Sequence, residues 1–381
     1  MDAYVHTDLR RGPLEKDFLG GPNAPNQSMK ILLAKLNHLG DTLLMTPTIR
    51  FLREKYPDAR IDVLVRAGCE AMLSGNPDVS NVIPVARPEK AKRTLAAGLS
   101  EFTNTFAKLF LRRYDYAFDL SDSDRSKLWM LLSAAKVRGV NDAYETLGNK
   151  RWMVNRISKF KWGREHQVLK DFQTVLDCTG LTGEVGPLRF YPQVDAGSIS
   201  KKLPFVSDIG NYTIVHPTSR WPFKQWLPER WAEIADTIRR NHKLKVVFSC
   251  GPDQREIDTV AEIFQHTKEE HFSTDGRINL NEFGWLLARA KLFLGVDTVA
   301  MHLAAAMQTP IVTLFGPSQE WSWRPWQAPN EIVFGDCPCK VAMVFKCDKT
   351  KVYPCMERIT VNDVVAATGR MLRLATADSK H

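Results

Sequence analysis

The residues of this chain best suited to chemistry lie in loops that follow short apolar runs. Asp41 stands directly after Gly40, just past the apolar run 29–36. Glycine permits a tight turn there, and a carboxylate at the start of the next helix could act as a general base in an open cleft. The same carboxylate could instead be an N-cap that accepts amide hydrogens of the first helical turn. The turn matches neither GxGxxG nor GxxxxGK[ST], the glycine-rich phosphate-binding fingerprints.

A second loop, 216–226, groups hydroxyl and basic side chains ahead of a helix. Thr218 and Ser219 supply hydroxyls, and Arg220 and Lys224 supply positive charge. Such a loop can hold a diphosphate through charge-assisted hydrogen bonds. The alternative is an ordinary surface loop in which Lys224 contacts water alone.

A third loop joins the apolar run 291–296 to an alanine-rich helix through Asp297, Thr298 and Val299. A helix start offers free amides and the positive end of the helix dipole, and both favour phosphate. His302 falls one turn into this helix, on the side of Thr298. The alternative is that Asp297 and Thr298 only cap the helix and that His302 is a core histidine.

A fourth loop, 119–125, holds clustered carboxylates at Asp119, Asp122 and Asp124. Carboxylates so close together could ligate a metal, but capping of the following helix is favoured. Arg125 at its end could face an anionic ligand.

Four of the seven cysteines crowd into the C-terminal region, at Cys337, Cys339, Cys347 and Cys355. Four thiols can hold a structural zinc ion, yet this spacing lacks the usual C-x2-C pairs. Free or loosely paired thiols are therefore favoured over zinc, and an odd number of cysteines in a long chain does not indicate a disulfide framework.

Composition sets the class of protein. The chain has 381 residues, of which 44% are hydrophobic and 25% charged, and these values exclude fibrous and largely disordered chains. At about 150 residues per domain, the length predicts two domains. No apolar run reaches the roughly 20 residues of a membrane-spanning helix. Residues 1–28 contain no continuous apolar block, so we expect no signal peptide and a cytoplasmic location.

The net charge of +9 favours anionic partners such as phosphates, nucleic acid or an acidic membrane. Two stretches concentrate it: 81–113 has seven Lys/Arg against two Asp/Glu, and 150–170 has seven against one. The second also contains Trp152, Phe160 and Trp162, a mixture that suits a lipid headgroup layer. A solvated basic face is the simpler interpretation. Nucleic acid is disfavoured, because no nucleic-acid-binding motif is present.

Apolar runs alternate with helical periodicity twice along the chain, which predicts parallel sheets covered by helices. The predicted strands are 29–36, 61–67, 81–86 and 114–121, then 212–217, 243–251, 291–296 and 310–316. The predicted helices are 42–56, 94–112, 124–135 and 166–179, then 227–241, 254–265, 281–290, 298–307 and 360–375. A stretch rich in Gly, Pro and Ser at 180–210 separates the two halves. Two α/β lobes are expected, with ligands at the carboxyl ends of the strands between them.

Segments 29–47, 212–226 and 293–317 resemble the ADP-heptose:lipopolysaccharide heptosyltransferases, glycosyltransferase family 9, and are most similar to the heptosyltransferase III type. The resemblance spans about residues 29–370 and implies a GT-B fold, with two Rossmann-like domains facing a central cleft. It divides the chain into an N-terminal extension (1–28), an acceptor-binding domain (29–185), a linker (186–210), a nucleotide-sugar-binding domain (211–360) and a C-terminal helix and tail (361–381).

The resemblance also implies roles for single residues. Asp41 takes the position of the family's catalytic carboxylate, and Lys224 that of the diphosphate-binding lysine. The remaining implied donor-site residues are Thr218, Ser219, Asp297, Thr298, Val299 and His302. Val299 departs from the family pattern, where many members carry glycine. A branched side chain there narrows the approach of the backbone to a ligand, so the donor sugar stays open.

The implied reaction is an inverting transfer of L-glycero-D-manno-heptose from ADP-heptose to a heptose or Kdo hydroxyl of the lipopolysaccharide inner core. It requires no metal or cofactor, and it implies peripheral association with the anionic cytoplasmic face of the inner membrane. The expected acceptor contacts are Arg66, Arg87, Lys90, Asp119 and Arg125. Two alternatives remain: another GT-B enzyme with a different donor or 2-epimerase activity, and a non-catalytic nucleotide-sugar-binding protein.

Overall fold

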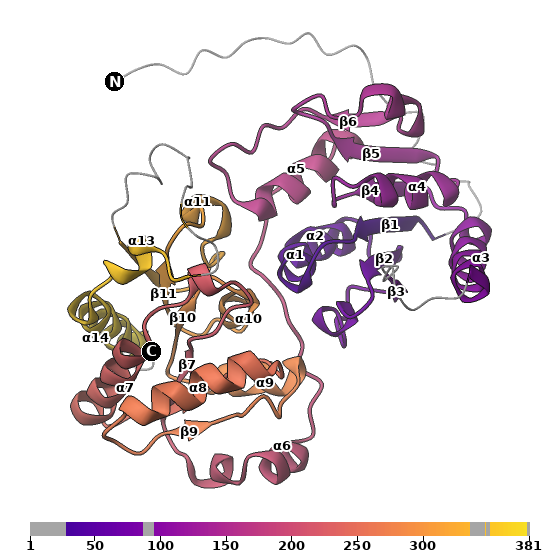
Figure 1. Cartoon of the computed structure of the whole chain (residues 1–381). Helices are drawn as coiled ribbons and strands as arrows, with labels where there is room; N and C mark the ends of the chain where they lie inside the picture. Colours follow the sequence, from indigo (N-terminus) through magenta and orange to yellow (C-terminus); the bar gives the residue numbers. More distant parts are fainter. Residues whose placement is uncertain (1–27, 87–94, 336–346, 348–350, 379–381) are drawn as a thin grey trace, which may run out of the picture.

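The computed structural model describes residues 28–86, 95–335, 347 and 351–378. The chain forms two lobes, each built on a six-stranded parallel sheet with helices on both faces (Figure 1). This confirms the predicted α/β class and the pair of parallel sheets. Among the described residues, no helix combines the length and the apolar character needed to cross a bilayer.

The first sheet has the strand order β3-β2-β1-β4-β5-β6. Its strands are β1 (Lys30–Lys35), β2 (Arg60–Arg66), β3 (Asn81–Val85), β4 (Tyr116–Asp119), β5 (Val137–Asn141) and β6 (Arg156–Ser158). Its helices are α1 (Leu39–Leu44), α2 (Thr46–Lys55), α3 (Leu95–Arg112), α4 (Asp124–Leu132) and α5 (Gln167–Thr179), with short 3-10 turns η1 (Glu70–Met72) and η2 (Gly148–Met153). The sequence predicted four of these strands and missed β5 and β6, whose polar residues and glycine interrupt any apolar run.

The second sheet has the order β12-β11-β10-β7-β8-β9. Its strands are β7 (Tyr212–His216), β8 (Lys245–Phe248), β9 (Phe272–Ser273), β10 (Leu292–Val296), β11 (Ile311–Phe315) and β12 (Asn330–Phe334). Its helices are α6 (Ala196–Lys202), α7 (Pro228–His242), α8 (Gln254–His266), α9 (Leu280–Leu287), α10 (Val299–Ala306), α11 (Glu320–Trp323), α13 (Pro354–Glu357) and α14 (Val361–Asp378), with η3 (Pro204–Asp208) and η4 (Pro222–Lys224).

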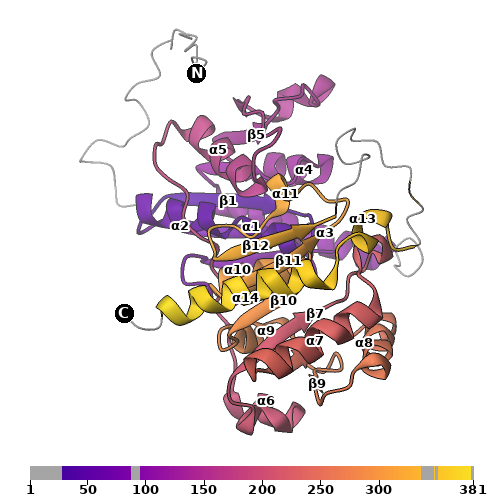
Figure 2. The same cartoon turned by 90° about the vertical axis from the view of Figure 1, so that its left-hand side faces the viewer.

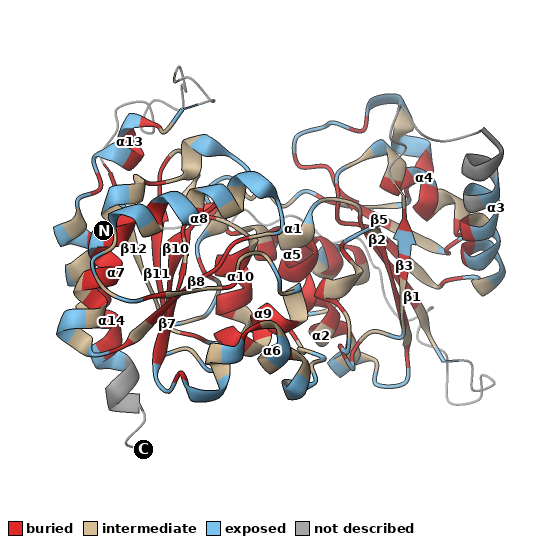
Figure 3. Cartoon of the chain, turned by 60° about the horizontal axis from the view of Figure 1, so that its bottom comes forward, coloured by how far each residue is buried: buried red, intermediate tan, exposed pale blue. Residues whose placement is uncertain are grey.

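Both faces of the central strands are buried, which explains their continuous apolar runs. In β1, Ile31 and Leu33 point into one core cluster, while Leu32 and Ala34 point into the cluster on the other face. Figure 3 shows the same arrangement across both lobes: buried residues follow the strands, and exposed residues lie on the outer sides of the helices.

The predicted helix 42–56 is divided at Met45 into α1 and α2. Pro47 causes this division, because proline has no backbone N–H and is tolerated only in the first turn of a helix. The shorter helix α1 begins at Leu39, and this places Gly40 and Asp41 inside its first turn.

The segment between the lobes is partly helical. The chain is extended up to Asp195 and then forms α6 and η3. Ile199 and Leu203 are buried in the same cluster as Tyr212 and Phe283, so this part of the segment packs into the second lobe. The C-terminal helix α14 lies along the second sheet beside α7 (Figure 2).

Several contacts join the lobes, among them one at α1 and one at His166. Helix α1 packs against α10, where Leu43 and Leu44 share an apolar cluster with Ala300 and Met301. The second contact involves His166, which is buried ahead of α5: its Nε2 lies 2.9 Å from the Arg324 carbonyl and its ring centroid lies 4.7 Å from that of Trp326.

The surroundings of His166 favour its neutral form. Its Nδ1 accepts a hydrogen bond from Val168 N at 3.2 Å, so the proton belongs on Nε2, which donates to Arg324. Burial lowers the pKa of His166 to about 4, although the hydrogen bond to the Arg324 carbonyl acts in the opposite direction. A second proton would sit on Nδ1, where it would face an N–H instead of an acceptor.

We expect the His166→Asn variant to lose part of the pH dependence of folding. His166 takes up a proton in the unfolded chain as the pH falls through about 6.5, but in the folded protein only at about pH 4. The contribution of neutral His166 to the free energy of unfolding is therefore fully present above pH 6.5 and is lost as the pH falls toward 4. At pH 5 the free energy of unfolding is lower by about 2 kcal/mol for this reason. Asparagine keeps the cap on α5 but cannot titrate. Denaturant unfolding of both proteins at pH 7 and pH 5 measures the difference, and equal losses would show that His166 is not responsible.

Candidate active site

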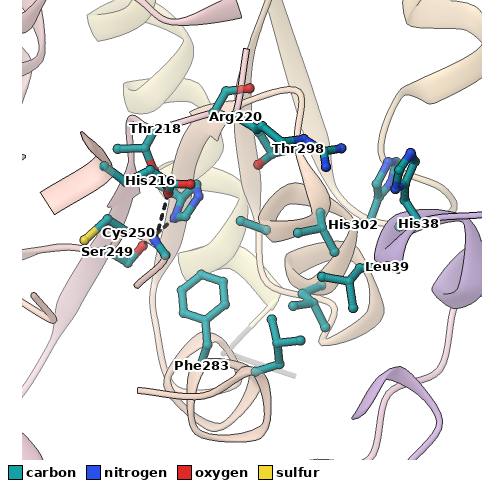
Figure 4. A pocket seen from close by; sticks show the side chains of 18 of the residues that line it. His38, Leu39, His216, Thr218, Arg220, Ser249, Cys250, Phe283, Thr298 and His302 are labelled. Carbon is teal, nitrogen blue, oxygen red and sulfur yellow. Dashed lines mark hydrogen bonds between the residues drawn. The ribbon is translucent and has the colours of Figure 1, made fainter. Parts of the chain in front are cut away.

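A cavity of about 930 Å³ lies between the lobes, at the carboxyl ends of β1, β2, β7, β8 and β10. The first lobe contributes the start of α1 and the loop after β2. The second lobe contributes the loops after β7, β8 and β10. Figure 4 shows His38 and Leu39 of the first lobe facing His302 and Thr298 of the second. The strand-following loops that the sequence singled out at 37–42, 216–226 and 295–306 therefore meet at one cavity.

Lys224 and Asp297 form an ion pair on the second-lobe wall. Lys224 Nζ lies 2.7 Å from Asp297 Oδ2, and the two side chains are 23% and 8% exposed. Lys224 is thus not a freely solvated surface lysine. Asp297 holds the ammonium group beside the N-terminus of α10, where this group adds to the positive end of the helix dipole.

The first turn of α10 carries no side-chain cap. Thr298 is the extended N-cap residue, and its hydroxyl lies 3.5 Å from the Val296 carbonyl instead of bonding a helix amide. Thr298, Val299 and Ala300 all line the cavity. The simple capping role considered for Thr298 is therefore wrong, and the helix start faces the space where an anion would be received.

His302 lies one turn further along α10. It is 3% exposed, and its Nδ1 is buried without a hydrogen-bond partner. Burial lowers its pKa, although Asp297 and Asp41 act in the opposite direction. The ring is therefore neutral at pH 7 and keeps a hydrogen-bonding nitrogen unused. A fully satisfied core histidine would not leave such a group.

Asp41 is half-buried on the first-lobe wall. The N-cap role considered for it was wrong, because His38 is the N-cap of α1 and Asp41 is the third residue of the helix; its Oδ2 accepts a hydrogen bond from the backbone N–H of His38 at 3.1 Å in a capping box. It also lines the cavity opposite α10, and its neighbour Gly40 lies against the ring of His302. The capping-box bond uses Oδ2 only, so it leaves the other carboxylate oxygen of Asp41 available to a ligand.

The hydroxyls of the loop after β7 bond within the protein. Thr218 Oγ1 donates to Glu256 Oε2 at 2.7 Å, and Ser219 Oγ accepts from Trp221 N at 3.2 Å. Both residues line the cavity, but these bonds also shape the loop that carries Lys224.

Sequence reasoning missed several lining residues. Glu256 of α8 accepts from Gly251 N at 2.8 Å as well as from Thr218, and His216 Nδ1 lies 3.0 Å from Ser249 Oγ. Burial lowers the pKa of His216 to about 4. The rule that ligands bind beyond carboxyl ends of strands could have pointed to the loop after β8, but nothing in the spacing of Glu256 reveals that its carboxylate turns back to this loop.

The expected acceptor contacts separate into three groups. Arg66 lines the cavity, with Nη1 3.1 Å from His38 Nδ1. Arg125 donates to the Ala86 carbonyl outside the cavity wall. Arg87 and Lys90 lie outside the described residues.

The expectation for Asp119 was wrong. Its carboxylate is 1% exposed, pairs with Lys127 Nζ at 3.1 Å and accepts from Ser121 N at 2.8 Å. These bonds satisfy the charge inside the first lobe, where an acceptor cannot reach it. A position after a strand shows which end of the sheet a residue occupies, but not whether its side chain points inward.

Within residues 28–86, 95–335, 347 and 351–378, no group of three or more His, Cys, Asp or Glu side chains is arranged to hold a metal ion. Cys355 is buried and Cys347 half-buried, while Cys337 and Cys339 lie outside the described residues. The zinc hypothesis therefore stays a prediction.

The comparison with known proteins agrees with this architecture. The sequence profile of glycosyltransferase family 9 (heptosyltransferase) matches residues 103–353. Lipopolysaccharide heptosyltransferase 3 of Escherichia coli is 29% identical over 343 residues, which cover 88% of this chain and 97% of that protein.

Two solved structures share the fold. The glycosyltransferase family 9 protein of Veillonella parvula superimposes with a TM-score of 0.76 at 19% identity, over 91% of this chain and 97% of that one. The E. coli heptosyltransferase WaaC, solved with ADP, superimposes with a TM-score of 0.69 at 19% identity, over 90% and 100% of the two chains. With two parallel sheets that face one cavity, this chain has the GT-B fold and belongs to glycosyltransferase family 9, the heptosyltransferases.

Proposed function

We propose that this protein transfers L-glycero-D-manno-heptose from ADP-heptose to a heptose or Kdo hydroxyl of the lipopolysaccharide inner core, with inversion at the anomeric carbon. The observation that carries the proposal is that Asp41 of one lobe and the Lys224–Asp297 pair of the other line the same cavity. The similarity to lipopolysaccharide heptosyltransferase 3 supports this choice of donor and acceptor.

The donor fits the second-lobe wall. The diphosphate of ADP would lie between Lys224 and the uncapped start of α10, where positive charge and free amides are available. Apolar side chains at Ile278, Leu280 and Phe283 form the deeper wall, which suits a flat base. The related heptosyltransferase WaaC was solved with ADP, and this supports ADP as the nucleotide of the donor.

The chemistry is a direct displacement. An acceptor hydroxyl attacks the anomeric carbon from the face opposite ADP, the new C–O bond forms as the bond to the diphosphate breaks, and Asp41 accepts the hydroxyl proton. Negative charge grows on the departing ADP, and Lys224 and the amides at Val299 and Ala300 stabilise it. The positive charge in this scheme comes from the protein, so the scheme requires neither a metal ion nor an organic cofactor.

The donor sugar is tested by incubation of the protein with ADP-heptose, and separately with other nucleotide sugars, in the presence of truncated lipopolysaccharide. Mass spectrometry should show one added heptose with ADP-heptose alone. Val299 gives a reason to include the other donors, because its branched side chain stands at the helix start where many family members have glycine. Transfer of a different sugar, or epimerisation of the nucleotide sugar without transfer, would replace the proposed activity.

We expect Asp41→Asn to lower turnover by roughly 10²- to 10⁴-fold, the usual contribution of a general base. The amide oxygen can still accept from His38 N, so α1 keeps its cap, and the affinity for ADP measured by calorimetry should stay within a few-fold of the original. Asp58→Asn, an exposed aspartate in the turn between α2 and β2, is the matched control. Full activity of the Asp41 variant would remove this residue from catalysis.

We expect Lys224→Ala to weaken ADP binding by roughly 10- to 100-fold, the range for loss of a charge-assisted hydrogen bond. ADP and ADP-heptose should be affected alike, because both carry the diphosphate. Lys201→Ala, an exposed lysine on α6, controls for the loss of one positive charge. An unchanged ADP affinity in calorimetry would contradict the assigned role of Lys224.

A further inference from the structure

Exposed apolar side chains gather on one outer layer of the first lobe. Helices α3 and α4 and the turn η2 cover the same face of the first sheet, where Leu109, Trp129 and Met153 belong to one buried cluster. The outer side of this layer carries large hydrophobic residues, namely Phe102, Phe110, Leu111, Leu128 and Trp152, which are 41%, 46%, 77%, 41% and 69% exposed. We call these five residues the α3–α4 face.

The apolar row on α3 lies at the border between the buried cluster and the surface. Phe102, Phe106 and Phe110 follow one another at intervals of four residues, with ring centroids 6.5 and 5.3 Å apart. The inward side of α3 is already filled by Thr105 and Leu109, both buried. Phe106 packs against the buried cluster and the Phe102 ring lies 5.0 Å from that of Trp129, but Phe102 and Phe110 keep much of their surface exposed. The outer side of a surface helix is normally polar, so these rings and Leu111 indicate a binding surface.

The charge of the chain is concentrated in the same lobe. Residues 95–164 contain thirteen Lys and Arg against seven Asp and Glu, whereas residues 165–381 contain 25 of each and are neutral in sum. The basic excess therefore lies entirely in residues 1–164. Lys108, Arg113 and Arg151, on or directly after the elements of the α3–α4 face, are exposed.

Exposed aromatic and aliphatic side chains among basic residues fit a membrane surface that carries anionic lipids. Aromatic rings favour the headgroup level, apolar side chains enter the upper acyl region, and lysines and arginines attract anionic headgroups. A second copy of this chain is disfavoured as the partner, because it would bring one basic lobe against another.

We propose that the α3–α4 face docks this enzyme on an anionic lipid surface. The inference rests on the proposed function, since a lipid-linked acceptor must reach the cavity from the membrane. Helix α4 begins at Asp124, shortly after β4 ends at Asp119, on the edge of the sheet that faces the second lobe.

Sedimentation with vesicles tests the surface. The protein should bind vesicles that contain phosphatidylglycerol, bind pure phosphatidylcholine more weakly, and lose affinity as the salt concentration rises. Leu111→Ser combined with Trp152→Ser should reduce binding at least roughly tenfold, because two exposed apolar groups no longer enter the bilayer. The matched control is Phe334→Ser with Leu374→Ser, two second-lobe positions that are 52% and 57% exposed.

Equal losses in the two double variants, or no vesicle binding by the original protein, would overturn the proposal. Concentration-dependent self-association that disappears in the Leu111/Trp152 variant would overturn it too, and would assign the face to a second copy. ADP affinity and turnover on a delipidated, soluble acceptor should be unchanged in this variant. If the original protein binds vesicles through this face but transfers no heptose, the proposed function fails while the lipid-binding surface stands.

Discussion

The apolar contact between α1 and α10 brings the starts of these two helices to one cavity. Leu43 and Leu44 of the first lobe pack into the same cluster as Ala300 and Met301 of the second. Small side chains on α10 allow the two helices to approach closely, and the starts of both helices then line one cavity. Asp41 and Lys224, which lie 183 positions apart in the sequence, line the same cavity beside this contact.

The electrostatics of the cavity follow from burial. Lys224 is held by Asp297 in the absence of a ligand, so its ammonium group is already placed when a diphosphate arrives. His302 stays neutral because it is buried, and Asp41 remains half-exposed beside water. Both walls carry charges of both signs, with Asp41 and Arg66 in the first lobe and Arg220, Lys224, Glu256 and Asp297 in the second. Lys224 at the start of α10 is therefore placed to stabilise negative charge, and Asp41 to accept a proton.

Part of this architecture could be predicted from the sequence. Strands β1, β7, β10 and β11 are continuous apolar runs because helices bury both of their faces, and the polar residues after them mark the edge of the sheet where ligands bind. Strands β6 and β9 are too short to form a pattern, with three and two residues. The break between α1 and α2 at Met45 could have been predicted from Pro47, which fits only in the first turn of a helix.

The site shows the same limit. Lys224, Asp297 and Asp41 could be identified because each follows a strand and has a charge that suits phosphate or proton transfer. Asp119 met the same criterion and was wrong, since Lys127 from the next helix neutralises it inside the lobe. The partners of Glu256 and His216 depend on how neighbouring loops fold over each other, and local spacing does not contain that information.

The central claim is that one sugar nucleotide sits between Asp41 and Lys224. The most direct measurement is a crystal structure of the D41N variant with ADP-heptose, in which slow turnover keeps the donor intact. The account predicts the diphosphate against Lys224 and the start of α10, with the anomeric carbon open toward the side chain at position 41. A donor bound elsewhere, or with its sugar turned away from the first lobe, would contradict it.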